Sequence, residues 1–172
     1  QQGNSPLAAL CRTYAAYTGN GFTAELPGPT GERNLYVLGG RAHIACVAAN
    51  ADHQLAQLAA VLAVGATAVW PHSSANAALL NQLPTDVRPH VQLSAHSQAA
   101  LLQNEAFDAL IADAASNWQA IGTQLTSRNG AIVPITAQAT DGSVPLFRLL
   151  AEHAISINTA AAGGNASLMT LA

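Results

Sequence analysis

The most regular hydrophobic pattern begins at residue 42, where short apolar runs alternate with amphipathic segments. Each run is continuously apolar, which is typical of strands that are buried on both faces of a sheet. We expect such strands at residues 43–49, 67–70, 90–93, 109–111, 131–135 and 154–158.

Between these runs, apolar residues recur every three or four positions, the spacing of a helix with one buried face. Leu55, Leu58 and Leu62 form such a face behind Asp52, a candidate N-cap, and Gly65 ends the segment. Strands that alternate with helices predict a mostly parallel sheet covered on both faces, a doubly wound, Rossmann-like α/β fold. Four more helices are expected. The first follows Ser73 or Ser74 and carries Leu79, Leu80 and Leu83, and the second spans 98–102. The third follows Ser116 and carries Trp118, Ile121 and Leu125, and the fourth spans 144–152 with Leu146, Leu149 and Leu150.

Both ends of the chain lie outside this alternation. Residues 6–17 predict a helix with Ser5 as its N-cap and Pro6 in its first turn. Residues 26–34 are rich in proline and glycine, which argues against a regular element there. We therefore divide the chain into an N-terminal helix and connector at 1–41, a Rossmann-like domain at 42–158 and a C-terminal docking tail at 159–172.

Composition excludes several classes of function. Half of the 172 residues are hydrophobic, which argues against a disordered chain. Lysine is absent, and six arginines face nine carboxylates, so there is no cationic stripe for nucleic acid. No apolar stretch predicts a membrane span. The two cysteines do not form a disulfide framework, which favours a reducing, cytoplasmic compartment. Because the chain starts without Met, we read it as part of a longer protein.

The turn after the first expected strand argues against a nucleotide site. Dinucleotide-binding folds place glycines there, so that a phosphate can approach the backbone. Residues 48–53 contain no glycine, and Asp52 brings negative charge to the place of a phosphate. Gly163 and Gly164 do not follow the required strand–turn–helix order. We expect no cofactor in this chain.

Candidate catalytic and metal-binding residues are weak. His96 and Ser97 are adjacent, but they lack the surrounding glycines of a nucleophile elbow, and a capping role for Ser97 or Ser94 is favoured. The histidines are not paired at metal-binding spacing. Cys46 lies within an apolar run and Cys11 on an apolar helix face, so both are expected in the core. We expect no catalytic and no metal-binding residue.

Two segments suggest contacts outside the domain. The connector at 26–34 is either an ordinary stiff linker or a docking segment, because prolines reduce the entropy lost on docking. The tail is small, nearly uncharged and glycine-bearing, and it carries apolar Leu168, Met169 and Leu171. Such a tail cannot build a core of its own, which predicts that it lies against another surface.

These same segments carry a family resemblance. Leu-Pro-Gly-Pro-Thr-Gly-Glu-Arg-Asn at 26–34 and Ser-Ile-Asn-Thr-Ala-Ala-Ala-Gly-Gly-Asn-Ala-Ser-Leu-Met-Thr at 156–170 resemble the C-terminal region of the proline utilization A family. Gln-Leu-Ala-Ala-Val-Leu-Ala-Val-Gly at 57–65 resembles the same region, as do Ala-Leu-Cys at 9–11 and Phe-Asp-Ala at 107–109. The resemblance covers essentially the whole chain.

The resemblance implies a context that the residues alone do not give. Members are bacterial bifunctional enzymes that oxidise proline with FAD and then oxidise glutamate semialdehyde to glutamate with NAD. Longer members carry an additional C-terminal domain with an aldehyde-dehydrogenase-like Rossmann fold, which is not itself catalytic. This domain packs on the aldehyde dehydrogenase module and helps to close the route of the intermediate. Some members also repress their own genes through a DNA-binding domain that has no counterpart here.

The predicted function is thus a noncatalytic structural domain, whose partner is the aldehyde dehydrogenase domain of the same polypeptide. The parent enzyme is expected in the cytoplasm, where it could lie on the inner membrane face, and homo-oligomers of the parent are compatible with this prediction. Two alternatives stay open: a degenerate Rossmann module that senses NAD or a metabolite, and a small enzyme that uses Ser97 or Cys46. The candidate docking residues are Glu32, Arg33, Asn34, Asn158, Thr159, Gly163, Gly164, Asn165, Ser167, Leu168 and Met169.

Overall fold

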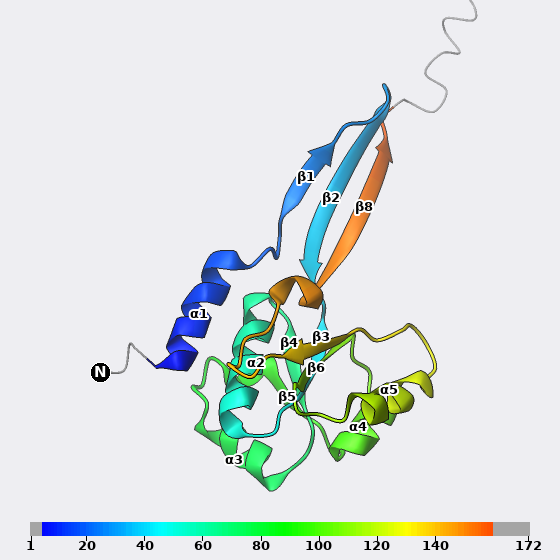
Figure 1. The fold of residues 1–172 in the computed structure, drawn as a ribbon. Coiled ribbons are helices and arrows are strands. Elements are labelled where there is room, and N and C mark those ends of the chain that lie inside the picture. Colours follow the sequence, from blue (N-terminus) through cyan, green and yellow to red (C-terminus); the bar gives the residue numbers. More distant parts are fainter. Residues whose placement is uncertain (1–4, 160–172) are drawn as a thin grey trace, which may run out of the picture.

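The computed structural model describes residues 5–159, which form a rounded body and a long arm that projects from it (Figure 1). The body holds a parallel five-stranded sheet in the order β5-β4-β3-β6-β7. This confirms the Rossmann-like α/β fold. The strands are β3 (His43–Val47), β4 (Thr67–Trp70), β5 (Val91–Leu93), β6 (Ala109–Asp113) and β7 (Ile135–Gln138).

Helices cover both faces of this sheet, because alternate side chains of each buried strand point to opposite sides. Ile44 and Cys46 of β3 join one apolar cluster, under α2 (Ala51–Ala63) and α3 (Ser74–Gln82). Ala45 and Val47 join the other, under α4 (Gln98–Asn104) and α5 (Trp118–Thr126). The two clusters are the core of the body.

The first helix, α1 (Pro6–Tyr17), packs on α2 at the outside of the body. Ser5 caps it by accepting the Ala8 N–H, as the sequence predicts. Tyr14 is buried, and its hydroxyl accepts the backbone N–H of Val144 at 2.8 Å. Among the other predicted caps, Ser73 is confirmed, whereas Asn50 and Asn117 cap α2 and α5 in place of Asp52 and Ser116.

The arm is a separate antiparallel sheet in the order β1-β2-β8. Its strands are β1 (Thr23–Leu26), β2 (Glu32–Gly40) and β8 (Leu150–Asn158). At about 3.3 Å per residue, the two nine-residue strands reach about 30 Å. β2 lies between β1 and β8, and it continues through two residues into β3 of the body.

The arm corrects three expectations. The connector at 26–34 was expected to lack regular structure, but it forms the turn of the β1–β2 hairpin and contributes residues to both strands. Residues 144–152 do not form an α-helix but a 3₁₀ turn, η3 (Leu146–Leu149), followed by the start of β8. The strand expected at 154–158 exists, but it pairs with β2 in the arm and not with the parallel sheet. The proposed domain boundaries themselves stay a prediction.

Two smaller shifts occur in the body. The strand expected at 131–135 begins only at Ile135, and a short 3₁₀ turn, η2 (Arg88–His90), precedes β5. Among the described residues, no helix has both the length and the apolar character needed to cross a bilayer.

Candidate docking surface and sheet-edge crevice

The predicted docking residues that the structure describes gather at the tip of the arm. Glu32 lies opposite Asn158 in the β2–β8 register, and Arg33 lies opposite Ile157. The Thr159 N–H donates to the Gly31 carbonyl at 2.8 Å, which closes the tip. Two segments from opposite ends of the chain therefore form one surface. Gly163, Gly164, Asn165, Ser167, Leu168 and Met169 lie outside the described residues.

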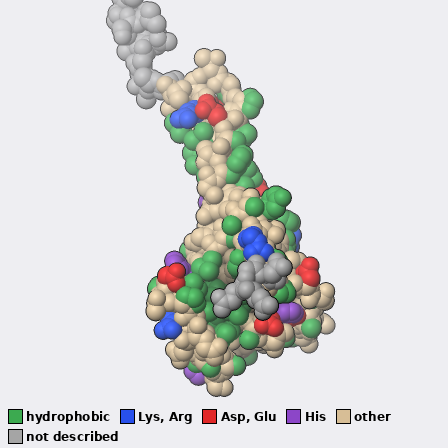
Figure 2. All heavy atoms as spheres, turned by 90° about the vertical axis from the view of Figure 1, so that its left-hand side faces the viewer, with side chains coloured by type: hydrophobic (Ala, Val, Ile, Leu, Met, Phe, Trp, Pro, Cys, Tyr) green, Lys and Arg blue, Asp and Glu red, His purple; other side chains and the backbone are tan. Residues whose placement is uncertain are grey.

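One face of the arm carries apolar side chains with little cover. Cross-strand neighbours share a face, so the register places Leu35 beside Ile155 and Arg33 beside Ile157. Ile155 and Ile157 remain 43% and 41% exposed. Arg33 also pairs with Glu25 at 3.2 Å, and both side chains are more than half exposed, so this ion pair adds little stability. Hydrophobic side chains line the arm in Figure 2, with charged side chains near its tip.

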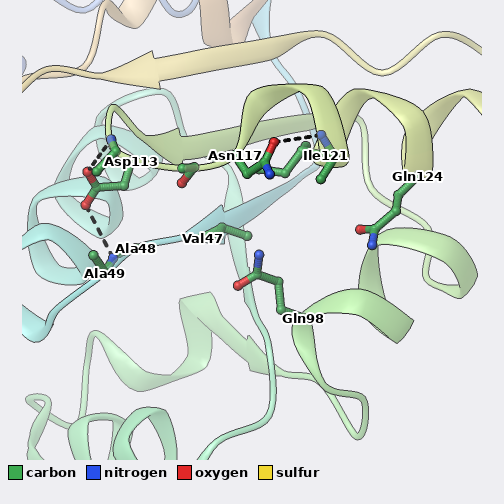
Figure 3. Close-up of a pocket in the computed structure, with 11 residues that line it drawn as sticks. Val47, Ala48, Ala49, Gln98, Asp113, Asn117, Ile121 and Gln124 are labelled. Atoms are coloured by element: carbon green, nitrogen blue, oxygen red, sulfur yellow. Dashed lines mark hydrogen bonds between the residues drawn. The ribbon is translucent and has the colours of Figure 1, made fainter.

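A second candidate site is a crevice at the carboxyl edge of the parallel sheet. A hollow of about 250 Å³ lies between the residues that follow β3 and those that follow β6. Gln98 and Gln124 line it, and Figure 3 shows Asp113 at one end with Ala49 beside it. A second hollow of about 310 Å³ lies between the ends of β3 and β4, and it shares Ala48, Ala49 and Gln98 with the first.

Asp113, the last residue of β6, is the charged residue that dominates this crevice, and it is 5% exposed. Its Oδ2 lies 2.5 Å from His53 Nδ1 and accepts the Ala49 N–H at 3.3 Å, while Oδ1 accepts the Ala115 N–H at 3.2 Å. Burial alone raises the pKa of this carboxyl, but these bonds outweigh burial and hold the pKa below its ordinary value. No local sequence pattern identifies Asp113, and the acidic residue expected at this edge from the sequence was Asp52, which is exposed on the first turn of α2.

The structure places the cysteine and serine candidates in different local environments. Cys46 is fully buried, and burial raises the pKa of its thiol, as expected for an inert cysteine. Cys11 is exposed, which corrects its expected place in the core. The Ser94 Oγ accepts the His96 N–H and donates to the Glu105 carboxylate. Ser97 occupies the N-cap position of α4, but its side chain makes no capping hydrogen bond. Among residues 5–159, no cluster of three or more His, Cys, Asp or Glu side chains could hold a metal ion.

Comparison with curated proteins decides the family. The chain is 40% identical over 167 residues to the bifunctional protein PutA of Escherichia coli K12, and 41% identical over 167 residues to that of Salmonella typhimurium. PutA of Rhizobium meliloti is 37% identical over 158 residues. The chain belongs to the proline utilization A family. The two enterobacterial matches cover 96% of this chain but only 12% of the relatives, so the chain spans about an eighth of the length of these PutA proteins. No protein-family model matches it.

Solved structures agree on the fold. A Bradyrhizobium japonicum PutA mutant matches 78% of this chain and 15% of its own with a TM-score of 0.52 and 24% identity. A lactaldehyde dehydrogenase matches 77% of this chain and 30% of its own with a TM-score of 0.59 and 12% identity. A benzaldehyde dehydrogenase from Corynebacterium glutamicum matches 77% and 32% with a TM-score of 0.58 and 13% identity. The chain therefore shares its Rossmann-like α/β fold with these solved structures.

Proposed function

We propose that this chain is a noncatalytic structural domain of a bifunctional proline-catabolising enzyme. The parent enzyme converts proline to glutamate through pyrroline-5-carboxylate and glutamate semialdehyde, with FAD in one module and NAD in the other, in the cytoplasm. The domain packs on the aldehyde dehydrogenase module of the same polypeptide and helps to close the route of the intermediate.

The observation that carries this proposal is the arm. An isolated domain gains nothing from an exposed strand pair that bears Leu35, Ile155 and Ile157 on one face, because burial of apolar surface needs a partner. The residues singled out in two distant segments, Glu32–Asn34 and Asn158–Thr159, meet at the tip of this arm. A partner seated there would contact both at once.

The test compares the parent enzyme with arm variants. Ile155→Asp places a charge opposite Leu35 on the exposed apolar part of the arm, and we expect coupled NADH formation from proline to fall about fivefold or more, the effect of losing a central interface residue. Proline oxidation by the FAD module should be unchanged. Ile132→Asp is the matched control, because Ile132 lies on the body and is 96% exposed. Equal activity of both variants would refute a docking role for the arm.

Two further measurements address the remaining parts of the proposal. The pure chain should show neither proline dehydrogenase nor aldehyde dehydrogenase turnover, and measurable turnover would contradict a noncatalytic role. Removal of residues 160–172 from the parent should impair the aldehyde dehydrogenase half, and unchanged coupled kinetics would count against a docking tail.

A further inference from the structure

The crevice beside Asp113 lies at a special point of the sheet. From β3 the chain runs to β4 and β5 on one side, and it then crosses to β6 and β7 on the other side. The strand order therefore reverses between β3 and β6. Folds of this kind bind their ligands outside the carboxyl ends of the strands at such a switch point, and in nucleotide-binding members a phosphate lies there against backbone N–H groups.

In this chain the backbone donors at the switch point already have an anionic acceptor. The Ala49 N–H follows β3 and the Ala115 N–H follows β6, and both donate to the carboxylate of Asp113. The ring of His53 contacts the same carboxylate from α2. Asp113 thus joins three segments at the edge of the sheet, and its side chain is 7% exposed.

We propose that Asp113 is a built-in anion, whose carboxylate occupies the position where this fold holds a ligand phosphate and closes the crevice to nucleotides and other anions. An entering phosphate would lie close to a fixed negative charge and would find the Ala49 and Ala115 donors taken, so both repulsion and lost hydrogen bonds oppose it. This inference concerns the crevice alone and does not depend on the role of the arm.

The proposal predicts that removal of the carboxylate uncovers an anion site. Asp113→Ala leaves the Ala49 and Ala115 N–H groups and the His53 ring nitrogen facing a space the size of a carboxylate. Formate is a carboxylate with only a hydrogen atom attached, so it should fit the space left by the Asp113 carboxylate. The bonds of all three groups to Asp113 are partly buried, and a charged acceptor forms stronger hydrogen bonds than a neutral one, so formate should compete with water for this space.

Asp108→Ala is the matched control. Asp108 precedes β6 at the opposite edge of the same sheet, where its Oδ2 accepts the His43 N–H at 2.9 Å. It therefore also bridges the β6 and β3 segments, but its side chain is exposed and no crevice residue is involved. Water can replace its carboxylate, so formate should have no site there.

The experiment uses the ¹⁵N-labelled 172-residue chain, titrated with sodium formate against sodium chloride of equal ionic strength. In Asp113→Ala we expect saturable shifts of the Ala49 and Ala115 amides and a thermal midpoint raised by about 3 °C or more at ten times Kd. In the wild type and in Asp108→Ala, neither effect should appear. Equal responses of the two alanine variants would overturn the proposal.

A second measurement does not require Asp113→Ala to fold. Inorganic phosphate and NAD, added separately to the wild-type chain, should leave the Ala49 and Ala115 amides unshifted. Shifts at these amides in the wild type would show that the crevice accepts anions despite Asp113, and this would overturn the proposal. Asp113→Asn keeps the space filled, so we expect no formate response from it, and a response equal to that of Asp113→Ala would also contradict it.

Discussion

Gly40 ends β2 where the arm meets the body, and it has no room for a side chain. A Cβ at this position would lie 1.9 Å from the Val64 carbonyl oxygen, a backbone atom at the end of α2 that cannot move without shifting the helix. We expect Gly40→Ala to lower the free energy of unfolding by about 3 kcal/mol, the upper range for overpacking. Urea denaturation of the chain measures this loss.

The neighbouring glycine provides the control for this prediction. A Cβ on Gly39 would be 3.9 Å from the His153 ring, an ordinary van der Waals distance. Gly39→Ala should therefore change the free energy of unfolding by less than about 1 kcal/mol. Similar losses in both variants would mean that general strand flexibility, and not the approach to Val64, explains the glycine pair.

Asp113 predicts a dependence of stability on acid. Its pKa is lower in the folded chain than the ordinary value of about 3.9, so the folded state favours the charged form. This contribution is fully present above pH ~4 and is lost as the pH falls through the folded pKa. The difference in free energy of unfolding between wild type and Asp113→Asn should therefore shrink between pH 6 and pH 3, measured by urea denaturation. A difference that stays constant over this range would contradict the ionic role.

At the scale of elements, a buried amide pair ties α2 to β7. Gln57 and Gln138 are both fully buried, and Gln57 Nε2 donates to Gln138 Oε1 at 2.8 Å and to the Val47 carbonyl. Gln138 Nε2 donates to the carbonyls of His53 and Gly142, each at 3.1 Å. We expect Gln138→Leu to cost about 2–3 kcal/mol of unfolding free energy, because it leaves buried groups without partners.

The double variant separates hydrogen bonding from packing. Gln57→Leu with Gln138→Leu should cost clearly less than the sum of the two single variants, because the pair then has no mutual bond to lose. Gln119→Leu on the exposed side of α5 is the control and should stay within about 0.5 kcal/mol. Additive losses in the cycle would contradict a direct coupling of the two amides.

The elements of the body could be predicted from the sequence because their patterns are local. A strand such as β3, buried on both faces, is continuously apolar, and α2 repeats its leucines every three or four residues. The switch-point role of Asp113 could not be read in this way, since its donors come from Ala49, His53 and Ala115 on separate segments.

The arm was missed for a related reason. Leu146, Leu149 and Leu150 have helical spacing, but that spacing also fits a 3₁₀ turn followed by a strand, and the pairing of Leu150 with Gly40 selects the strand. The partner of β8 lies at the other end of the chain, so no local pattern reveals it. The sequence did identify residues of the arm tip, although their role in docking remains a proposal.

At the scale of the whole molecule, the arm should be less stable than the body. Its exposed strands bury few side chains, whereas Ile44 and Ile111 in the body are fully buried. We expect amides in the β2–β8 ladder to exchange with deuterium about tenfold or more faster than those of β3 and β6 in the isolated chain. Hydrogen exchange followed by mass spectrometry measures this difference.

The parent enzyme provides the comparison for this measurement. If the arm is covered by another module, its exchange should slow there, while β3 and β6 change little. Equal protection of arm and body in the isolated chain would contradict the predicted difference in stability. Unchanged arm exchange in the parent would argue against docking.

The arm also determines the order in which parts of the protein can fold during synthesis. Its long strands lie on either side of the body in the sequence, and the backbone bond from Arg41 to Leu149 joins them at the base. A growing polypeptide can form the parallel sheet and the β1–β2 hairpin, but the second edge of β2 stays unpaired until residues 150–158 have been synthesised. A chain cut short before them leaves β2 with an open edge beside Leu35 and Val37, which is a template for aggregation. A chain that ends before residue 150 should therefore fold its parallel sheet but aggregate through the open edge of β2.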